Sequence, residues 1–137
     1  MTKLLVDTNI VIDLLANRSA FVSEAQALFT LADQKKVKLY VSSLTFANTY
    51  YILSQKMKLE NVRKTLRTFK VLLEVLPMDD KIIDLALDSD FKDFEDAIQY
   101  NTAIENGINI IITRNLKDFK TAKIPVLTAK DFIKIKT

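Results

Sequence analysis

Apolar residues recur along this chain at two spacings, one typical of buried strands and one typical of amphipathic helices. Short apolar runs predict strands at residues 3–6, 38–41, 74–77, 108–113 and 125–127. Apolar positions three and four apart predict helices at residues 9–16, 19–33, 44–55, 60–73, 79–87, 94–106 and from 129 onward. Strands that alternate with helices predict an α/β fold, in which a central, mainly parallel sheet carries helices on both faces as a three-layer α/β/α sandwich.

The length and composition are those of one ordinary globular domain, which we expect to span residues 1–137. Hydrophobic residues make up 49% of the chain and charged residues 27%, which argues against extended disorder. No apolar segment approaches the roughly 20 residues that a membrane helix needs. We therefore expect a cytoplasmic protein with no membrane partner.

Three absences limit the chemistry. The chain has no Cys and no His, which excludes disulfides, zinc–thiolate sites and histidine-based catalytic triads. It has one Gly, which excludes a glycine-rich phosphate loop. Catalysis must therefore depend on carboxylates, Lys, Tyr or a metal held by oxygen ligands, and such ligands favour Mg²⁺, Mn²⁺ or Ca²⁺. A net charge of +3 is compatible with a polyanionic partner without demanding one.

Acidic residues stand at three places where an α/β fold forms its crevice. Asp7 directly follows the first apolar run, and Asp118 lies in the polar turn after the strongest strand signal. Asp93 and Asp96 stand at the start of the predicted helix 94–106, where capping of the helix is the commonest use of such residues and a functional role is the alternative. Because ligands bind beyond the carboxyl ends of parallel strands, these carboxylates are candidates for one site. Carboxylates gathered there would repel one another unless a divalent cation neutralised them.

The same segments resemble the PIN-domain family. The resemblance rests on Val-Asp-Thr-Asn at 6–9, Phe-Glu-Asp-Ala at 94–97 and Ile-Ile-Ile-Thr-Arg-Asn-Leu-Lys-Asp-Phe at 110–119, and it covers nearly the whole chain. It implies a compact α/β/α sandwich and an acidic site that holds Mg²⁺ or Mn²⁺ to cleave RNA. Small prokaryotic members are similar to VapC-type toxins, which are endoribonucleases neutralised by a partner antitoxin.

Matched to the family motif, Asp7 takes the first acidic position, Asp96 the third and Asn115 the fourth, with Asp118 just behind it. The resemblance thus implies catalytic roles for these four residues, with Asp7, Asp96 and Asp118 as metal ligands. The residues that it implies as supporting groups are Thr8, Asn9, Asn48 and Thr113.

The chain departs from the family pattern at Asn48, where an acidic residue is usual, and again at Asn115. Each amide can still ligate a hard cation but removes a negative charge. Asn48 lies on the apolar stripe of its helix, so it is either a paired core amide or a participant in the site, and Glu95 is a candidate for the missing charge. The alternative function is a catalytically weakened module that binds RNA or a protein without cleaving. Aspartyl-phosphate chemistry fits poorly, because Asn9 stands where a second Asp would be needed.

The expected partners are RNA and a cognate antitoxin. Arg114 and Lys117 flank the predicted acidic turn and are the candidate RNA contacts, Arg114 above all because it lies in the turn itself. Homodimerisation is common in the family that the chain resembles, and exposed apolar residues such as Phe46 or Tyr50 would serve it.

Overall fold

A five-stranded sheet forms the centre of the molecule in the computed structural model, which describes residues 1–136. Its strands are β1 (Thr2–Val6), β2 (Val37–Ser42), β3 (Glu74–Leu76), β4 (Ile110–Ile112) and β5 (Val126–Leu127). They lie in the order β3-β2-β1-β4-β5, and each of these neighbouring pairs is parallel. The predicted parallel sheet is confirmed, with β1 at its middle.

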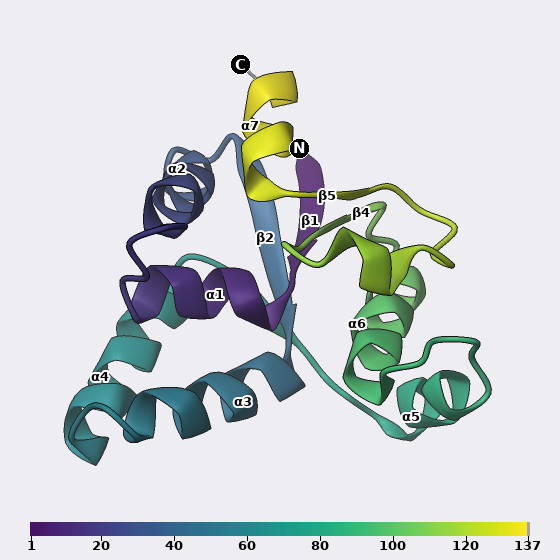
Figure 1. The fold of residues 1–137 in the computed structure, drawn as a ribbon, viewed down its shortest axis with the longest axis horizontal. Helices are drawn as coiled ribbons and strands as arrows, with labels where there is room; N and C mark the ends of the chain where they lie inside the picture. Colours follow the sequence, from purple (N-terminus) through teal and green to yellow (C-terminus); the bar gives the residue numbers. More distant parts are fainter. Residues whose placement is uncertain (137) are drawn as a thin grey trace.

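Helices cover both faces of this sheet (Figure 1). They are α1 (Thr8–Leu15), α2 (Val22–Asp33), α3 (Ser43–Ser54), α4 (Leu59–Lys70), α5 (Asp80–Leu87), α6 (Phe94–Glu105) and α7 (Ala129–Lys136), with a 3₁₀ turn η1 (Leu116–Phe119). In Figure 1, α1, α2 and α7 lie on one side of β1 and β2, and α5 and α6 lie on the other. The predicted α/β class, with helices on both faces of a parallel sheet, is therefore confirmed.

The sheet separates two hydrophobic cores because successive side chains of a strand point to opposite faces. Leu4 and Val6 of β1 pack in the core beneath α1, α2 and α7. Leu5, between them, packs on the other side with Ile111 of β4 and Ala103 of α6. All three β1 side chains are fully buried, which fixes the position of whatever follows β1 in the chain.

Two local sequence signals, a capping Asp and a Gly, set the ends of α6. Asp93 Oδ1 accepts a hydrogen bond from the Asp96 amide at 3.0 Å, as expected of a helix cap. At the other end Gly107 has a φ of 67°, and the Ile108 amide donates to the Ala103 carbonyl at 2.9 Å. Glycine adopts this left-handed conformation without steric cost, so the helix stops there and the chain turns into β4.

Some predicted boundaries and exposures differ in the structure. The strand expected at 108–113 is limited to Ile110–Ile112, because the Ile108 amide closes the end of α6. Phe46 and Tyr50, expected as exposed dimer contacts, are partly buried against the core. The Phe46 ring lies 6.0 Å from that of Phe69, so packing onto α4 accounts for it.

Within residues 1–136, we find no helix with the length and apolar character needed to cross a membrane.

Candidate active site

Asp7 lies at the junction of β1 and α1, at the carboxyl end of the central strand. The strand leaves its side chain only 7% exposed, and its Oδ1 accepts a hydrogen bond from the Thr8 amide at 2.8 Å. Its Oδ2 accepts from the Thr113 hydroxyl at 2.8 Å and from the Asn9 amide nitrogen at 3.4 Å. Every hydrogen bond seen at this carboxylate within residues 1–136 therefore comes from a neutral donor.

The parallel pairing of β1 with β4 explains why Thr113 reaches Asp7 across 106 residues of sequence. Val6 is in register with Ile112, so the residues that follow the two strands lie side by side. Asn9 reinforces the junction, because its Nδ2 donates to the Thr113 hydroxyl at 3.2 Å and its Oδ1 accepts from the Arg114 amide at 3.3 Å. The network holds the Asp7 carboxylate in one orientation.

Thr8 belongs to a different network from that of Asp7. Its hydroxyl lies 3.0 Å from the Thr45 hydroxyl, and Gln99 Nε2 donates to both, at 3.4 Å and 3.0 Å. Thr45 is on α3 and Gln99 on α6, so these buried groups join three elements beneath the site. Sequence reasoning missed Thr45 and Gln99; the available signal was a polar residue at an inward position of each helix.

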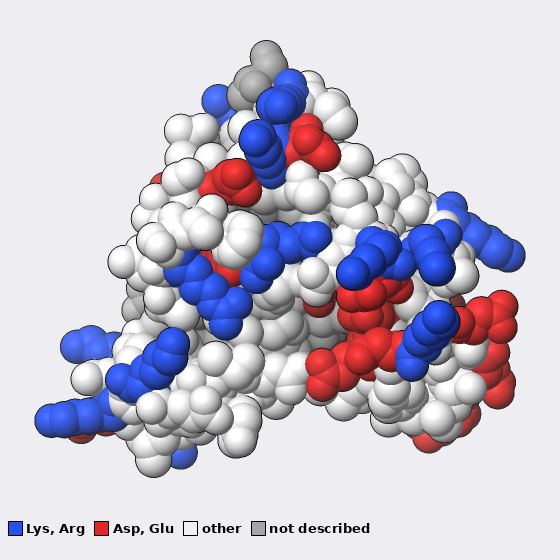
Figure 2. All heavy atoms as spheres, viewed as in Figure 1, with Lys and Arg blue, Asp and Glu red and all other residues white. Residues whose placement is uncertain are grey.

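Asp96 faces a cavity of about 270 Å³ between the start of α6 and η1. Its wall includes Asp93, Asp96 and Asp118, and Lys117 and Lys120 line it as well. Figure 2 shows acidic side chains gathered beside a hollow near the middle of this face, with basic side chains along one rim. Three of the predicted site residues, Asp96, Asp118 and Lys117, are thus brought to one cavity.

Burial and repulsion from neighbouring carboxylates disfavour the charged forms of Asp7 and Asp96. Burial raises the pKa of Asp7 above its usual value, although the hydrogen bonds from Thr113 and Thr8 lower it in part. Burial, followed by the negative charges of Asp7, Asp93, Asp118 and Glu95, raises the pKa of Asp96 to about 7. The charge of Asp7 therefore acts on Asp96, although the two residues are 89 positions apart in the sequence.

A divalent cation fits this donor set. In the part of the chain that the structure describes, no Lys or Arg forms an ion pair with Asp7 or Asp96, and no three carboxylates are arranged as a ready-made metal cage. Mg²⁺ commonly binds through one or two carboxylates and keeps several water ligands, so a closed cage is not required. The oxygen-only chemistry and the uncompensated charge suit such an ion.

The two amides at expected acidic positions have different surroundings. Asn48 is half-buried on α3, and its Nδ2 donates to Glu95 Oε2 at 3.3 Å. Asn115 is exposed, and its contact with the site is made by its backbone amide, which donates to the Thr113 hydroxyl at 3.1 Å. Glu95 thus turns toward α3.

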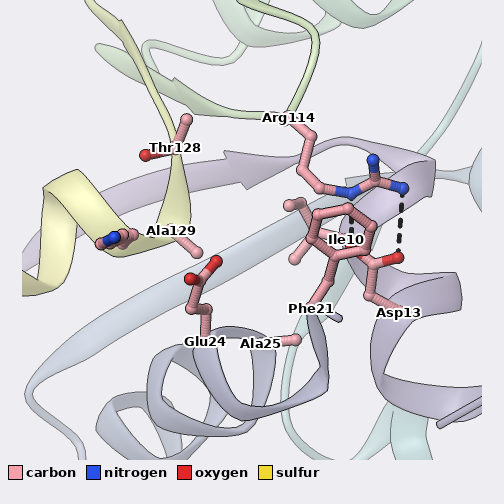
Figure 3. A pocket seen from close by; sticks show the side chains of 9 residues that line it. Ile10, Asp13, Phe21, Glu24, Ala25, Arg114, Thr128 and Ala129 are labelled. Atoms are coloured by element: carbon pink, nitrogen blue, oxygen red, sulfur yellow. Dashed lines mark hydrogen bonds and ion pairs between the residues drawn. The ribbon is translucent and has the colours of Figure 1, made fainter. Parts of the chain in front are cut away.

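Arg114 points away from the acidic cavity. Its Nε and Nη2 donate to the two carboxylate oxygens of Asp13 at 2.7 Å and 3.2 Å, and its guanidinium lies 3.9 Å from the centre of the Phe21 ring. Figure 3 shows this arrangement, with Glu24 and the start of α7 across a separate cavity of about 240 Å³. A contact between Arg114 and RNA remains a prediction, and it would have to use the remaining N–H groups of the guanidinium.

The chain matches a known family. The model of the PIN domain matches residues 3–117, and the chain therefore belongs to the PIN domain family. Ribonuclease VapC1 of Aquifex aeolicus is 28% identical to it, over 95% of this chain and 92% of that protein.

Solved structures contain chains with a similar fold. A toxin–antitoxin complex from Klebsiella pneumoniae contains a chain that is 27% identical, with a TM-score of 0.66 over 91% of this chain and 96% of that one. VapBC2 from Rickettsia felis, bound to a DNA fragment from its promoter, matches with a TM-score of 0.69 at 20% identity, over 92% and 97% of the two chains. The second likeness concerns the fold alone.

Proposed function

We propose that this chain is a divalent-metal-dependent endoribonuclease and the toxin of a toxin–antitoxin pair. Membership of the PIN domain family supports the nuclease, as does similarity along 95% of the chain to a protein named Ribonuclease VapC1. Similarity to a chain of the Klebsiella pneumoniae toxin–antitoxin complex supports an antitoxin partner. RNA is the substrate in this proposal.

The observation that carries the proposal is the pair formed by Asp7 and Asp96. Both carboxylates are at least partly buried, the charge of Asp7 raises the pKa of Asp96, and no cationic side chain within residues 1–136 pairs with either. A purely structural acid pair would gain stability from a Lys or Arg partner. An uncompensated pair of which one member, Asp96, lines an open cavity favours an ion taken from solution.

Asp7 and Asp96 would hold the cation. Asp118 lines the same cavity as Asp96 and would act on the cation through a bound water, because no three carboxylates within residues 1–136 are arranged to share one ion directly. A bound divalent cation supplies Lewis-acid activation of water and of the scissile phosphate. The donors to Asp7, Thr113 and Asn9, orient its carboxylate before substrate arrives.

Other residues of the chain would act on the RNA. Lys117 and Lys120 line the same cavity as Asp96 and would attract and position phosphates at its mouth. The exposed side chain of Asn115 would contact RNA or an outer water, whereas Thr8 would support the site through its hydroxyl, which contacts Thr45 on α3 and Gln99 on α6.

The test is cleavage of a mixed pool of structured RNAs by the purified protein in Mg²⁺, in Mn²⁺ and in EDTA, followed on denaturing gels. We expect cleavage at discrete sites with either metal and none in EDTA. RNA binding that is salt-dependent and indifferent to chelator, with no cleavage under either metal, would overturn the proposal. That result would identify the non-catalytic binding module instead.

A further inference from the structure

A hydrogen bond between two side chains 47 residues apart joins α3 to α6 at the edge of the acidic site. Asn48 Nδ2 donates to Glu95 Oε2 at 3.3 Å. Glu95 is in the first turn of α6, directly before Asp96, where an exposed side chain has no intrinsic reason to turn toward another helix. The contact with Asn48 supplies that reason.

A second bond between the same helices fixes their relative position. Gln99 Nε2 on α6 donates to the Thr45 hydroxyl on α3 at 3.0 Å, and both side chains are buried. Thr45 precedes Asn48 by three residues, and Gln99 follows Glu95 by four, so each helix contributes two residues on one face. Two hydrogen bonds therefore join α3 to α6, and the contact between Asn48 and Glu95 is not an isolated surface contact.

The charge of Glu95 acts on the site itself. It is one of the negative charges that act on both Asp7 and Asp96, although Glu95 is exposed and those two acids are buried or half-buried. An acidic residue at position 48 would place two carboxylates within hydrogen-bond distance and would repel Glu95. The amide at 48 instead donates a hydrogen bond to Glu95 and turns its carboxylate toward α3.

We propose that Glu95 supplies the negative charge that this chain lacks on α3, and that Asn48 is the positioning residue that holds Glu95 at the cation site. The inference rests on the proposed metal-dependent function. Because no three carboxylates within residues 1–136 are arranged to share one ion directly, Glu95 acts through its charge and through water. Its loss should weaken cation binding without abolishing it.

The experiment is a calorimetric titration of the apo-protein with Mn²⁺, made on the wild type and on Glu95→Gln. We expect Glu95→Gln to weaken Mn²⁺ binding by about tenfold, the effect typical of residues that act on a metal from outside its direct ligands. The matched control is Glu60→Gln. Glu60 is also exposed and is also the second residue of a 12-residue helix, so the change removes the same charge from the same helix position far from the site.

The role of Asn48 is tested by a double-mutant cycle in the same titration. If Asn48 acts through Glu95, Asn48→Ala weakens Mn²⁺ binding in the wild type and has no further effect in the Glu95→Gln background. A merely structural Asn48 would lower the unfolding temperature equally in both backgrounds and leave Mn²⁺ affinity unchanged.

The outcomes separate this inference from the proposed function. Wild-type protein that binds no Mn²⁺ would overturn both. Wild-type protein that binds Mn²⁺, with Glu95→Gln indistinguishable from Glu60→Gln, would overturn the role of Glu95 alone. Additive effects of Asn48→Ala and Glu95→Gln would overturn the positioning role of Asn48.

Discussion

Two buried aspartates six residues apart, Asp7 and Asp13, have opposite electrostatic surroundings. Asp13 is 1% exposed and pairs with two cations of the chain, Arg114 at 2.7 Å and Arg18 at 3.6 Å. Asp7 is 7% exposed and accepts hydrogen bonds only from neutral donors within residues 1–136. Burial raises the pKa of Asp7 because no positive charge offsets it.

The presence of cationic partners at Asp13 and their absence at Asp7 distinguish a structural carboxylate from one that can bind a ligand. At Asp13 the chain supplies the compensating charge itself, and the bidentate pair anchors α1 to the loop that follows β4 (Figure 3). At Asp7 the protein fixes the orientation of the carboxylate and leaves its charge uncompensated. A site that must take up a cation from solution needs this arrangement, since a Lys or Arg partner would compete with the ion.

The two regions share one loop. Thr113 donates to Asp7 and the next residue, Arg114, pairs with Asp13, so the ion pair also holds the loop that positions Thr113. The ion pair at Asp13 therefore helps to keep Thr113 in position to orient the Asp7 carboxylate.

The strongest test of the contrast is the same substitution at both positions. Asp7→Asn should reduce RNA cleavage by about 1000-fold, because a bound cation contributes several kcal/mol of transition-state stabilisation. Asp13→Asn should retain cleavage when equal amounts of folded protein are compared on denaturing gels. Equal losses in the two variants would show that Asp7 has no special part in the chemistry.

Removing the positive charge of Arg114 from its ion pair with Asp13 should reduce the stability of the fold. Arg114→Met leaves Asp13 buried without its principal partner and should lower the free energy of unfolding by about 3 kcal/mol, measured by urea denaturation. The control is Lys38→Met, which breaks the exposed pair with Glu74 and should cost less than about 1 kcal/mol. Adding Asp13→Leu to Arg114→Met should recover part of the loss. Equal costs for Arg114→Met and Lys38→Met would contradict the structural role.

A smaller effect should appear in the pH dependence of the protein's stability, through Asp96. The folded protein holds the Asp96 proton up to a pKa of about 7, whereas the unfolded chain releases it near 3.8. The folded state binds more protons between these values, so this group's contribution to stability is present below about pH 4 and is lost as the pH rises toward 7.

The measurement is the unfolding temperature in EDTA of the wild type and of Asp96→Asn, between pH 5 and 8. Asp96→Asn should gain stability relative to the wild type as the pH rises, and Mg²⁺ should narrow the difference at pH 7.5 by stabilising the wild type. A difference that does not change with pH would mean that Asp96 is not under electrostatic strain.

Local sequence patterns were sufficient to predict much of the fold. Short apolar runs located the strands because the central strands are buried on both faces, and helical spacing located the helices because each buries one face. Asp93 and Gly107 marked the ends of α6 because their preferences are local. The meeting of Asp7 with Thr113 followed from parallel strands that end at one edge of the sheet.

The tertiary structure decided which partner each polar side chain took. Arg114 stands in the acidic turn of the sequence, yet its long side chain reaches Asp13 on α1. Glu95 turns to Asn48 because a separate bond between Thr45 and Gln99 places α3 against α6. The sequence by itself determined the elements, the strand ends and the principal acids, since these depend on spacing along the chain. The charge compensation of Asp13 and the absence of a cationic partner for Asp7 within residues 1–136 depend on distances between elements, which only packing sets.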